Sequence, residues 1–300
     1  MTLLGCRITE PVGAAFDASK KAVVLNGDTV KSKVVITPTP PNMSSYITLT
    51  VKKDSAISLG FKAAADGTPV RIVSGSNTQD ITVGTDWTDF ISYTADGTTM
   101  IVYGDITNFA CDDNGANLTA LDPSHNTQLT ELYCNNNTLT SLNVSKNTQL
   151  TRLGCSINRL SNLDVSHNTQ LTGLGCSNNR LSNLDVSHNT QLTELYCGEN
   201  TLSSLDVTKN TQLTKLDCSF NTLSSLDVTK NTKLKELECW SNQLSSLDVS
   251  HNTQLTRLGC YNNRLSNLDI SHNTQLTSLG CSNNRLSNLD ISHNTQLTSL

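Results

Sequence analysis

The residues that could do chemistry in this 300-residue chain recur at a constant interval. Thiols can bind zinc or form disulfides, histidines can act as general bases or metal ligands, and aspartates can hold calcium. Here a cysteine stands every 21 residues, at Cys134, Cys155, Cys176, Cys197, Cys218, Cys239, Cys260 and Cys281. The histidines and aspartates follow the same interval. A residue present in almost every repeat is more readily explained by what the repeat needs structurally than by catalysis.

The cysteine spacing favours buried thiols over zinc ligation or disulfides. Adjacent strands of a sheet lie about 4.8 Å apart, so stacked repeats would place consecutive cysteine side chains parallel to one another. Parallel side chains suit stacking better than bridging. A line of sulfur atoms with all six histidines elsewhere is not a tetrahedral zinc site. A free cysteine behaves as a small apolar residue, so we expect these thiols in the core and infer no compartment from them.

The histidines and aspartates form two further columns. Each histidine precedes an asparagine of the repeat, at a place where Lys146, Lys209 and Lys230 also occur, which indicates a solvated corner. Aspartates recur every 21 residues from Asp164 to Asp290, and neighbours would repel by ~0.8 kcal/mol in water at about 5 Å. Calcium bridging would relieve this repulsion, and hydrogen bonds to nearby Ser or Thr are the alternative. The candidate calcium ligands are Asp206, Asp227 and Asp248; no other metal and no cofactor is expected.

The repeated frame reads Leu-x-x-Leu-x-Cys-x-x-Asn-x-Leu-x-x-Leu-Asp-Val-Ser-x-Asn-Thr-Gln. A period in this range is typical of a solenoid. The alternation in Leu-x-Cys and in Leu-Asp-Val predicts two short strands per coil. We therefore expect a mainly β, flattened right-handed solenoid with parallel strands on both sides and little or no helix. The two asparagine columns should hydrogen-bond turn groups of their own and adjacent coils, since a buried amide left unpaired costs ~1–3 kcal/mol. Full copies begin at Leu129, Leu150, Leu171, Leu192, Leu213, Leu234, Leu255 and Leu276.

This frame resembles the leucine-rich repeats, whose core pattern is L-x-x-L-x-L-x-x-N/C-x-L. It is most similar to the short bacterial 21-residue variant, the IRREKO type, with consensus LxxLxCxxNxLxxLDLxxN; the first full copy here is LTELYCNNNTLTSLNVSKN. The resemblance covers about residues 106–300, with one degenerate copy at 106–128 followed by eight full ones. It implies a secreted or surface protein of bacteria.

Two segments precede the repeats. Residues 1–45 end in TPTPPNMSS and are interpreted as a flexible segment or linker. Residues 46–105 hold short strand candidates separated by turns such as Asp66-Gly67 and Asp96-Gly97, which predict a small all-β, sandwich-like domain. We expect this domain to cap the open apolar end of the solenoid at 106–300. Separate carbohydrate binding is the alternative.

Both ends of the chain carry a further expectation. Leu3-Leu4-Gly5-Cys6 resembles a bacterial lipobox, in which Cys6 would be acylated, although only five residues precede it. Either the protein begins upstream or the match is chance. At the other end, residues 297–300 open a ninth copy without completing it. We expect an incomplete C-terminus, and an open last coil should fray or associate end to end.

Composition and motifs exclude several functions. The net charge of −5 and the lack of a basic patch argue against a nucleic-acid partner, and no apolar run approaches the 18 residues of a membrane-spanning helix. The chain contains no G-x-S-x-G, H-E-x-x-H or P-loop motif, so we expect no enzyme activity. A passive spacer in a larger protein remains open, as does the binding module of an enzyme whose catalytic domain lies beyond Leu300.

The variable positions of the repeat predict a binding face. The Leu-Asp-Val half hardly changes between copies, whereas the cysteine-bearing half varies. Three aromatic residues fall in consecutive coils there, and aromatic residues are common interface anchors; drift at unconstrained surface positions is the alternative. The sequence thus favours a surface or secreted binding protein that recognises a protein or glycan, adhesion included. Its candidate residues are Tyr133, Arg152, Tyr196, Asp217, Phe220, Glu238, Trp240 and Tyr261.

Overall fold

The computed structural model describes residues 6–7, 14–17, 22–25, 28–30 and 37–300. Two small antiparallel sheets occur in the first part of this set. One pairs β1 (Cys6–Arg7) with β5 (Thr37–Pro38); the other contains β2 (Ala14–Asp17), β3 (Ala22–Leu25) and β4 (Asp28–Val30). Residues 3–5 of the lipobox-like motif lie outside the described residues, so acylation of Cys6 stays a prediction.

Two larger sheets enclose one apolar core between residues 46 and 122. The five-stranded sheet has the order β13-β6-β11-β8-β9, and the facing sheet starts with β10-β7-β12. Buried side chains of both sheets, such as Leu49 and Phe61, belong to one cluster. The strands are β6 (Tyr46–Val51), β7 (Ala56–Ala63), β8 (Thr68–Ser74), β9 (Asn77–Val83), β10 (Ile91–Thr94), β11 (Thr99–Tyr103), β12 (Ile106–Ala110) and β13 (Leu118–Asp122).

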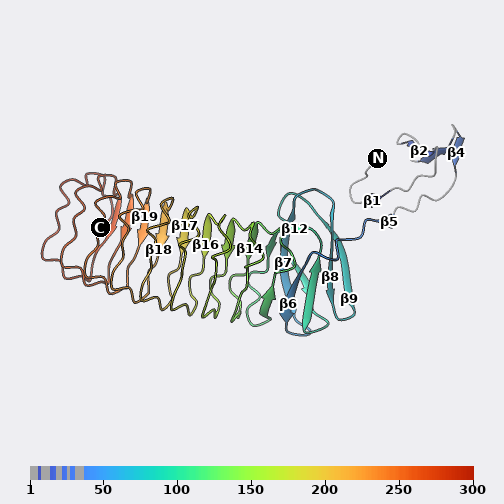
Figure 1. The fold of residues 1–300 in the computed structure, drawn as a ribbon, viewed down its shortest axis with the longest axis horizontal. Coiled ribbons are helices and arrows are strands. Elements are labelled where there is room, and N and C mark those ends of the chain that lie inside the picture. Colours follow the sequence, from blue (N-terminus) through green and yellow to red (C-terminus); the bar gives the residue numbers. More distant parts are fainter. Residues whose placement is uncertain (1–5, 8–13, 18–21, 26–27, 31–36) are drawn as a thin grey trace.

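The degenerate first coil is shared between these sheets and the solenoid. Its strand β12 pairs antiparallel with β7 and parallel with β14 (Glu131–Tyr133). Its second strand, β13, pairs antiparallel with β6. Phe109 of this coil packs against Phe61 with 5.7 Å between ring centroids. The core therefore runs without interruption from the two sheets of residues 46–122, which we call the β unit, into the repeats. Figure 1 shows the coils stacked directly on these sheets.

Each repeat contributes one three-residue strand to a parallel ladder. Leu132 pairs with Leu153, Leu153 with Leu174, and so on, so that identical frame positions form straight rows along the ladder. No helix occurs among the described residues. The predicted architecture, a mainly β solenoid, is thereby confirmed. After β14 the ladder strands are β15 (Arg152–Gly154), β16 (Gly173–Gly175), β17 (Glu194–Tyr196), β18 (Lys215–Asp217), β19 (Glu236–Glu238), β20 (Arg257–Gly259) and β21 (Ser278–Gly280).

The expectation of a second ladder at Leu-Asp-Val is wrong. In the eight full repeats this segment forms no strand. Side chains occupy the backbone groups that a ladder would need: Asp164 Oδ1 accepts a hydrogen bond from Ser166 N, at 2.9 Å. Asn168 Nδ2 donates to Val144 O of the preceding coil, at 3.0 Å. Asx side chains compete with backbone pairing in this way because they reach nearby main-chain groups.

The first asparagine column satisfies the corner after each ladder strand. Asn158 Nδ2 donates to Cys155 O of its own coil and to Cys134 O of the preceding coil, at 3.1 and 2.9 Å. Its Oδ1 accepts from Leu139 N, at 3.0 Å. One buried amide thus joins two coils through both of its polar atoms. The prediction of hydrogen bonds within and between coils is confirmed for this column.

From Asn147 to Asn294 the second asparagine column is satisfied only on its nitrogen side, and in Asn126 neither Nδ2 nor Oδ1 has a partner within the described protein. Asn168 Nδ2 donates to Asn147 O as well as to Val144 O, at 2.9 and 3.0 Å. Turning the amide over would direct its oxygen at these two carbonyl oxygens, so the two acceptors fix the orientation of the amide. The amide oxygens have no partner within the described protein, against our expectation. They belong to Asn126, Asn147, Asn168, Asn189, Asn210, Asn231, Asn252, Asn273 and Asn294.

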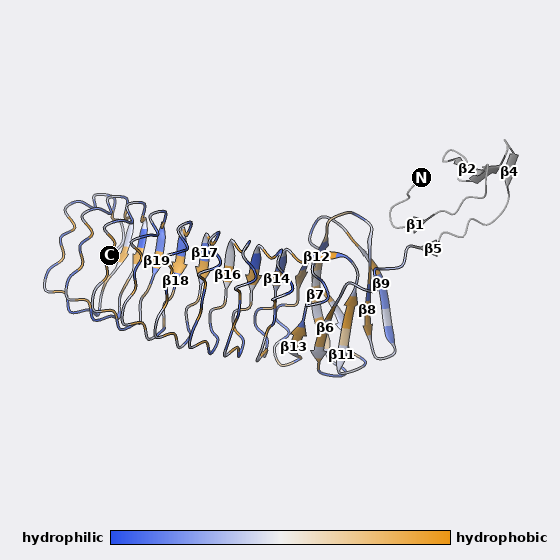
Figure 2. Cartoon of the chain, in the orientation of Figure 1, coloured by the Kyte–Doolittle hydropathy of each residue, from blue (hydrophilic) through white to orange (hydrophobic). Residues whose placement is uncertain are grey.

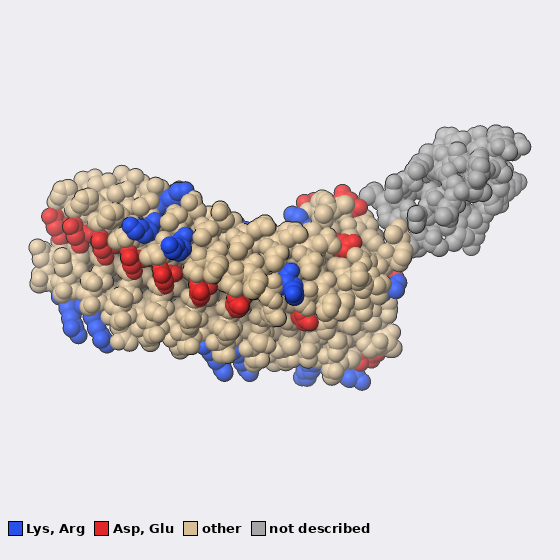
Figure 3. Space-filling model, in the orientation of Figure 1, with Lys and Arg blue, Asp and Glu red and all other residues tan. Residues whose placement is uncertain are grey.

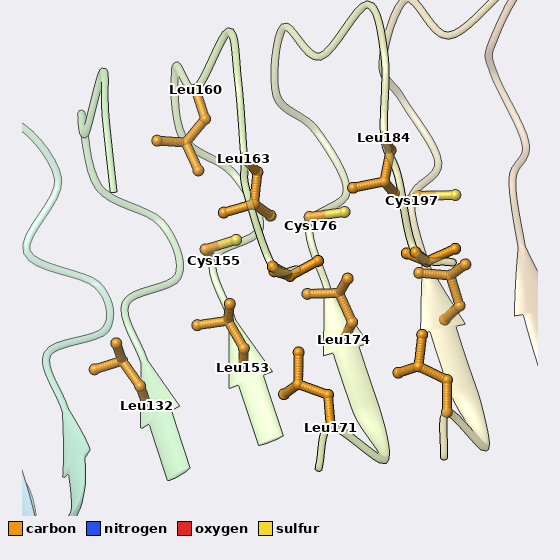
Figure 4. Packing of buried hydrophobic residues seen from close by; sticks show 14 of the residues in the cluster. Leu132, Leu153, Cys155, Leu160, Leu163, Leu171, Leu174, Cys176, Leu184 and Cys197 are labelled. Atoms are coloured by element: carbon orange, nitrogen blue, oxygen red, sulfur yellow. The ribbon is translucent and has the colours of Figure 1, made fainter. Parts of the chain in front are cut away.

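The cysteines of the repeats line the core between leucines, as Figure 4 shows for Cys155, Cys176 and Cys197. All nine from Cys111 onward are free thiols, eight buried and Cys281 half-buried. Burial raises the pKa of the Cys176 thiol to about 12. These thiols are therefore neutral at physiological pH and pack as apolar groups.

Substitution of Cys197 tests this packing role. We expect Cys197→Ser to lower the free energy of unfolding by about 1–3 kcal/mol, because a hydroxyl is placed in an apolar layer. Cys197→Val should cost less, since it keeps the site apolar. Urea denaturation of both variants measures the difference, and a serine variant as stable as the valine variant would contradict a core role for the thiol.

Asn200→Ala tests the first asparagine column. The change removes the donor to Cys176 O and the acceptor of Leu181 N, both in the preceding coil. Each buried backbone group left unpaired costs ~1–3 kcal/mol, so we expect a loss of at least about 2 kcal/mol in chemical denaturation. Ser204→Ala, on the exposed surface of the same coil, should change stability by less than about 0.5 kcal/mol. Equal effects of the two substitutions would refute the role assigned to Asn200.

Candidate functional site

The eight sequence-predicted residues occupy the outward face of the parallel ladder and the turn that follows it. Each lies in one of four rows, and every one is exposed or half-buried. Arg152 is in the first strand position, and Phe220 follows its cysteine by two residues. Because the ladder keeps equivalent positions in register, residues of one row are neighbours in adjacent coils. Tyr133, Tyr196, Asp217 and Glu238 take the third strand position, and Trp240 and Tyr261 directly follow their cysteines.

Three of these residues form an aromatic cluster: Phe220, Trp240 and Tyr261. The rings of Trp240 and Tyr261 are stacked, with centroids 4.8 Å apart and planes 11° apart. Phe220 meets Trp240 edge to face at 4.3 Å. Such pairs are worth ~0.5–1.5 kcal/mol beyond the area that they bury. The cluster spans three consecutive coils and leaves Phe220 48% exposed.

Phe220 has a left-handed backbone conformation, with φ of 48°. Every coil has one such residue, two positions after the cysteine, and Asn or Asp usually fills it, for example Asn178 and Asn262. Left-handed φ costs a side chain with a Cβ ~1–2 kcal/mol, and Asn and Asp tolerate it best. Two apolar residues depart from the rule, Phe220 and Ile157 (φ 55°), and both are about half exposed. Backbone preference disfavours an apolar side chain at this position. Of the two, Phe220 lies beside another partly exposed ring, that of Trp240, and it is therefore the candidate for a binding role.

A charged pair adjoins the aromatic cluster. Arg257 Nε donates to Glu238 Oε1, and this bond raises the pKa of the Arg257 guanidinium above its usual value. Gly259 makes the arrangement possible: a Cβ there would lie 1.9 Å from Glu238 Oε2 and 3.3 Å from Trp240 Cδ1. The missing side chain lets Glu238 and Trp240 lie across the next coil. Glu238 and the aromatic cluster thus form one continuous surface, which we call the aromatic face.

Of the remaining predicted residues, Asp217 borders the aromatic face, because it pairs with Glu238 in the ladder, and Tyr196 pairs with Asp217 one coil further on. Tyr133 and Arg152 lie farther away. Tyr133 lies near the β unit, where its hydroxyl donates to Glu131 Oε2 at 3.1 Å. Burial and this carboxylate raise the pKa of Tyr133 to about 12. Arg152 Nη1 reaches Glu194 Oε2 at 3.8 Å, two coils away, across Gly173. Five coils separate Tyr133 from Glu238, about 24 Å along the ladder, so the predicted set divides into separate groups.

Sequence reasoning missed a second group of exposed apolar residues, in the β unit. Trp87, Phe90 and Ile91 are 39%, 55% and 40% exposed. Trp87 lies 6.0 Å from Tyr133 between ring centroids. These residues lie outside the repeats, so no comparison between copies could identify them. Ile157 could have been found, because it replaces the asparagine that several other copies have.

The aspartate column makes hydrogen bonds within its own turns. Asp206 Oδ1 accepts from Thr208 N and from Thr208 Oγ1, at 2.9 and 2.7 Å, and Asp227 and Asp248 repeat the pattern. Figure 3 shows a line of acidic side chains along the solenoid. Across the described residues there is no group of three or more His, Cys, Asp or Glu side chains placed to hold a metal. Calcium binding here remains an untested prediction.

Comparison with solved structures identifies the class. The functional domain of InlJ from Listeria monocytogenes, which includes a cysteine ladder, is 40% identical with a TM-score of 0.56, covering 68% of this chain and 51% of that one. The protein LIC12759 of Leptospira interrogans shares the fold at 22% identity and a TM-score of 0.55, covering 59% and 49%. This chain therefore spans about half the length of each. It is a leucine-rich-repeat protein, with 21-residue repeats and a cysteine ladder.

A plant protein shares the fold as well. The leucine-rich-repeat ectodomain of the membrane receptor kinase GASSHO1/SCHENGEN3 from Arabidopsis thaliana, in complex with CASPARIAN STRIP INTEGRITY FACTOR 2, is 25% identical with a TM-score of 0.51. The match covers 54% of this chain and 22% of that one. No protein-family model matches this sequence, and neither does any curated protein.

The aspartate column predicts a loss of stability in acid. Hydrogen bonds from the residue two positions on lower the pKa of each carboxyl from Asp164 to Asp290. A pKa that is lower in the folded state stabilises it above the unfolded value, about 3.9, and the gain disappears as pH falls through the folded value. The melting temperature should thus fall progressively below about pH 4.

Asparagine substitution provides the control for this acid effect. Asn143 already stands in the aspartate column, and its Oδ1 accepts from Ser145 N at 3.0 Å. Asp227→Asn combined with Asp248→Asn should therefore keep the fold and reduce the acid-induced drop in melting temperature. An unchanged pH profile in the double variant would show that the acid sensitivity arises elsewhere.

Proposed function

We propose that this chain is a non-enzymatic binding module that recognises another protein through the aromatic face. The observation that carries the proposal is the left-handed, half-exposed Phe220 beside Trp240 and Tyr261. Backbone strain and water-exposed aromatic area both disfavour this arrangement in the free protein. A partner that covers the three rings would remove their apolar surface from water, which contributes about 25 cal/mol of binding free energy per Å² buried.

A protein partner is favoured over a glycan by the make-up of the face. Interface anchors are typically aromatic residues and arginine surrounded by polar groups; here Arg257 and Glu238 flank the rings. The ectodomain of GASSHO1/SCHENGEN3, which shares the fold, was solved with a bound factor, and this supports binding as a use of such repeats. A passive spacer would have no need of a strained, exposed Phe220. An enzyme with its catalytic domain beyond Leu300 would still use this face for binding.

We place the module on the surface of a bacterium or outside it, adhesion included. The similarity to InlJ of Listeria monocytogenes supports this location. No helix of the described residues is long and apolar enough to cross a membrane. A lipid anchor at Cys6 and end-to-end self-association belong to the same proposal.

We also propose that residues 46–105 cap the solenoid, with 1–45 as a linker before them and 106–300 as the repeats. The pairing of β12 with β7 and of β13 with β6 supports the cap. Through these pairs, antiparallel strands cover the edge of the first coil. Without them this edge would be exposed, and exposed edges invite association.

Phe220→Asn tests the proposed binding face most cleanly. Asparagine suits left-handed φ, so the variant should fold at least as stably as the parent while losing one of the three rings. The ligand would first be identified on arrays of bacterial and host extracellular proteins, with a glycan array in parallel. Titration by calorimetry should then show at least about a 30-fold weaker Kd, the loss typical of a hot-spot residue.

Ile157→Asn is the matched control, since it makes the same backbone correction three coils away. It should leave the affinity unchanged. Full affinity of Phe220→Asn, or an equal loss in both variants, would reject the aromatic face as the site. Binding to glycans alone would reject a protein partner.

A further inference from the structure

The strand β9 is the edge of the five-stranded sheet, at the end of the β unit farthest from the repeats. It pairs with β8 alone among the described strands, and Figure 1 shows it on the side of the β unit opposite the coils. Its residues from Asn77 to Asp80 are all exposed, and so is Thr82. Edge strands present unpaired backbone groups to which another strand can bond, so the sheet can be extended at β9.

Three residues of β9 direct their backbone groups away from β8. The β8–β9 hairpin closes through a two-residue turn, in which Gly75 has the positive φ, 59°, of a type II′ turn. The residue that follows such a turn, Asn77, is hydrogen-bonded to β8, and along an antiparallel ladder hydrogen-bonded and non-hydrogen-bonded residues alternate. Thr78, Asp80 and Thr82 therefore turn their N–H and C=O groups outward. No strand or loop of the described chain pairs with these groups.

The strand β9 lacks the features by which sheet edges are usually protected. Protected edges are short or bulged, or they carry lysine or proline, whereas β9 has seven residues in unbroken register with β8 and contains neither residue type. Its one charge, on Asp80, is paired with Arg71, whose Nε and Nη2 donate to the carboxylate at 2.7 and 2.8 Å. The other edge strand of the β unit, β10, has only four residues and follows Asp86 and Asp89. The contrast identifies β9 as the edge that is open to pairing.

The side chains of β9 favour a second copy of the chain over an unrelated peptide. Recognition of a foreign strand depends on pockets for its alternate side chains, whereas the residues from Asn77 to Asp80 are polar and exposed. Figure 2 shows the contrast between hydrophilic β9 and apolar β8. A twofold-related copy needs no pockets, because the same strand supplies both halves of a self-complementary contact.

Charge and space determine the register of such a contact. Centring the pair on Asp80 would place two aspartates directly opposite each other, which is destabilising. Centring it one position further along the strand would move the partner toward Thr82, where Pro40 lines the same hollow. Centring it on Gln79 avoids both problems. Thr78 of each copy then lies opposite Asp80 of the other, hydroxyl beside carboxylate.

We propose that two copies of the chain pair through their β9 strands, antiparallel and centred on Gln79, so that two five-stranded sheets join into one. Each pairing of Thr78 with Asp80 exchanges two backbone hydrogen bonds, and the two Gln79 amides meet on the twofold axis. The contact lies at the opposite end of the molecule from the last coil, so it is separate from end-to-end association there.

The pairing has a consequence for binding. Because each solenoid extends from the sheet on the side away from β9, the two solenoids of the dimer point in opposite directions. The dimer therefore carries two aromatic faces and can bind bivalently. This consequence rests on the proposed function, whereas the pairing itself does not.

Sedimentation equilibrium of the complete 300-residue chain tests the pairing. From micromolar to near-millimolar concentrations the parent should show a reversible dimer. Gln79→Lys places two like charges opposite each other on the axis, and it should raise the Kd of the dimer at least about tenfold. Ser204→Lys adds the same charge on the exposed surface of the solenoid and should leave this Kd unchanged. A monomeric parent, or an unchanged Kd in Gln79→Lys, would overturn the proposal.

Cysteine cross-linking tests the register, in a Cys6→Ser background that removes the terminal thiol. Gln79→Cys places a thiol in a non-hydrogen-bonded pair on the axis, where Cα atoms lie ~4.5 Å apart, within the range of a disulfide. Thr78→Cys is the matched control, because position 78 lies opposite Asp80 of the other copy. Mild oxidation should yield a covalent dimer of the first variant and little of the second.

Equal cross-linking of the two variants, or none in either, would reject the proposed contact. Phe220→Asn should dimerise like the parent, so failure of the aromatic-face proposal would leave this one intact. A parent-like Kd for Phe220→Asn together with a raised Kd for Gln79→Lys would support β9 as the contact.

Discussion

Hydrogen bonds from buried asparagine side chains are the interaction on which the rest of the solenoid depends. A 21-residue coil has to turn sharply several times, and each turn leaves backbone carbonyl and amide groups facing the core. In the first asparagine column, the nitrogen of one amide group donates to the cysteine carbonyl oxygens of its own coil and of the preceding coil. The oxygen of the same amide accepts from a leucine N–H of the preceding coil. No other uncharged side chain of this size both donates twice and accepts. The asparagine therefore has to recur in every repeat, and this requirement keeps the repeat length constant.

This constraint separates positions that are committed to the fold from positions that are free. Leucine, cysteine, valine and asparagine point inward and stay the same from coil to coil, whereas the outward strand positions and the left-handed residue carry no such demand. The aromatic side chains of Phe220, Trp240 and Tyr261 stand at such unconstrained outward positions. Gly259 stands at another, and because it has no side chain, Glu238 and Trp240 can lie over the neighbouring coil. A binding surface can thus change without disturbing the core beneath it.

Much of this organisation could be predicted from the sequence, because each inward position repeats and repetition reveals burial. The cysteine row, the first asparagine column and the variable face follow from comparing copies. The missing second ladder could not be predicted, since Leu-Asp-Val alternates like a strand, and only the geometry shows that Asp164 and Asn168 occupy its backbone groups. Phe90 and Trp87 occur once each and offered no internal comparison.

Hydrogen exchange at the leucine amides of the first corner tests the central claim most directly. Leu181, Leu202 and Leu223 each donate their backbone N–H to an asparagine Oδ1 of the next coil, at 2.9–3.0 Å. If these side chains hold the coils together, the three amides will exchange as slowly as those of the ladder leucines, such as Leu195 and Leu216. The amides of the exposed residues Ser203 and Ser204, in the coil of Leu202, will exchange rapidly. Rapid exchange at the three leucines alongside a protected ladder would show that the coils are held by the strands alone, and would contradict the account.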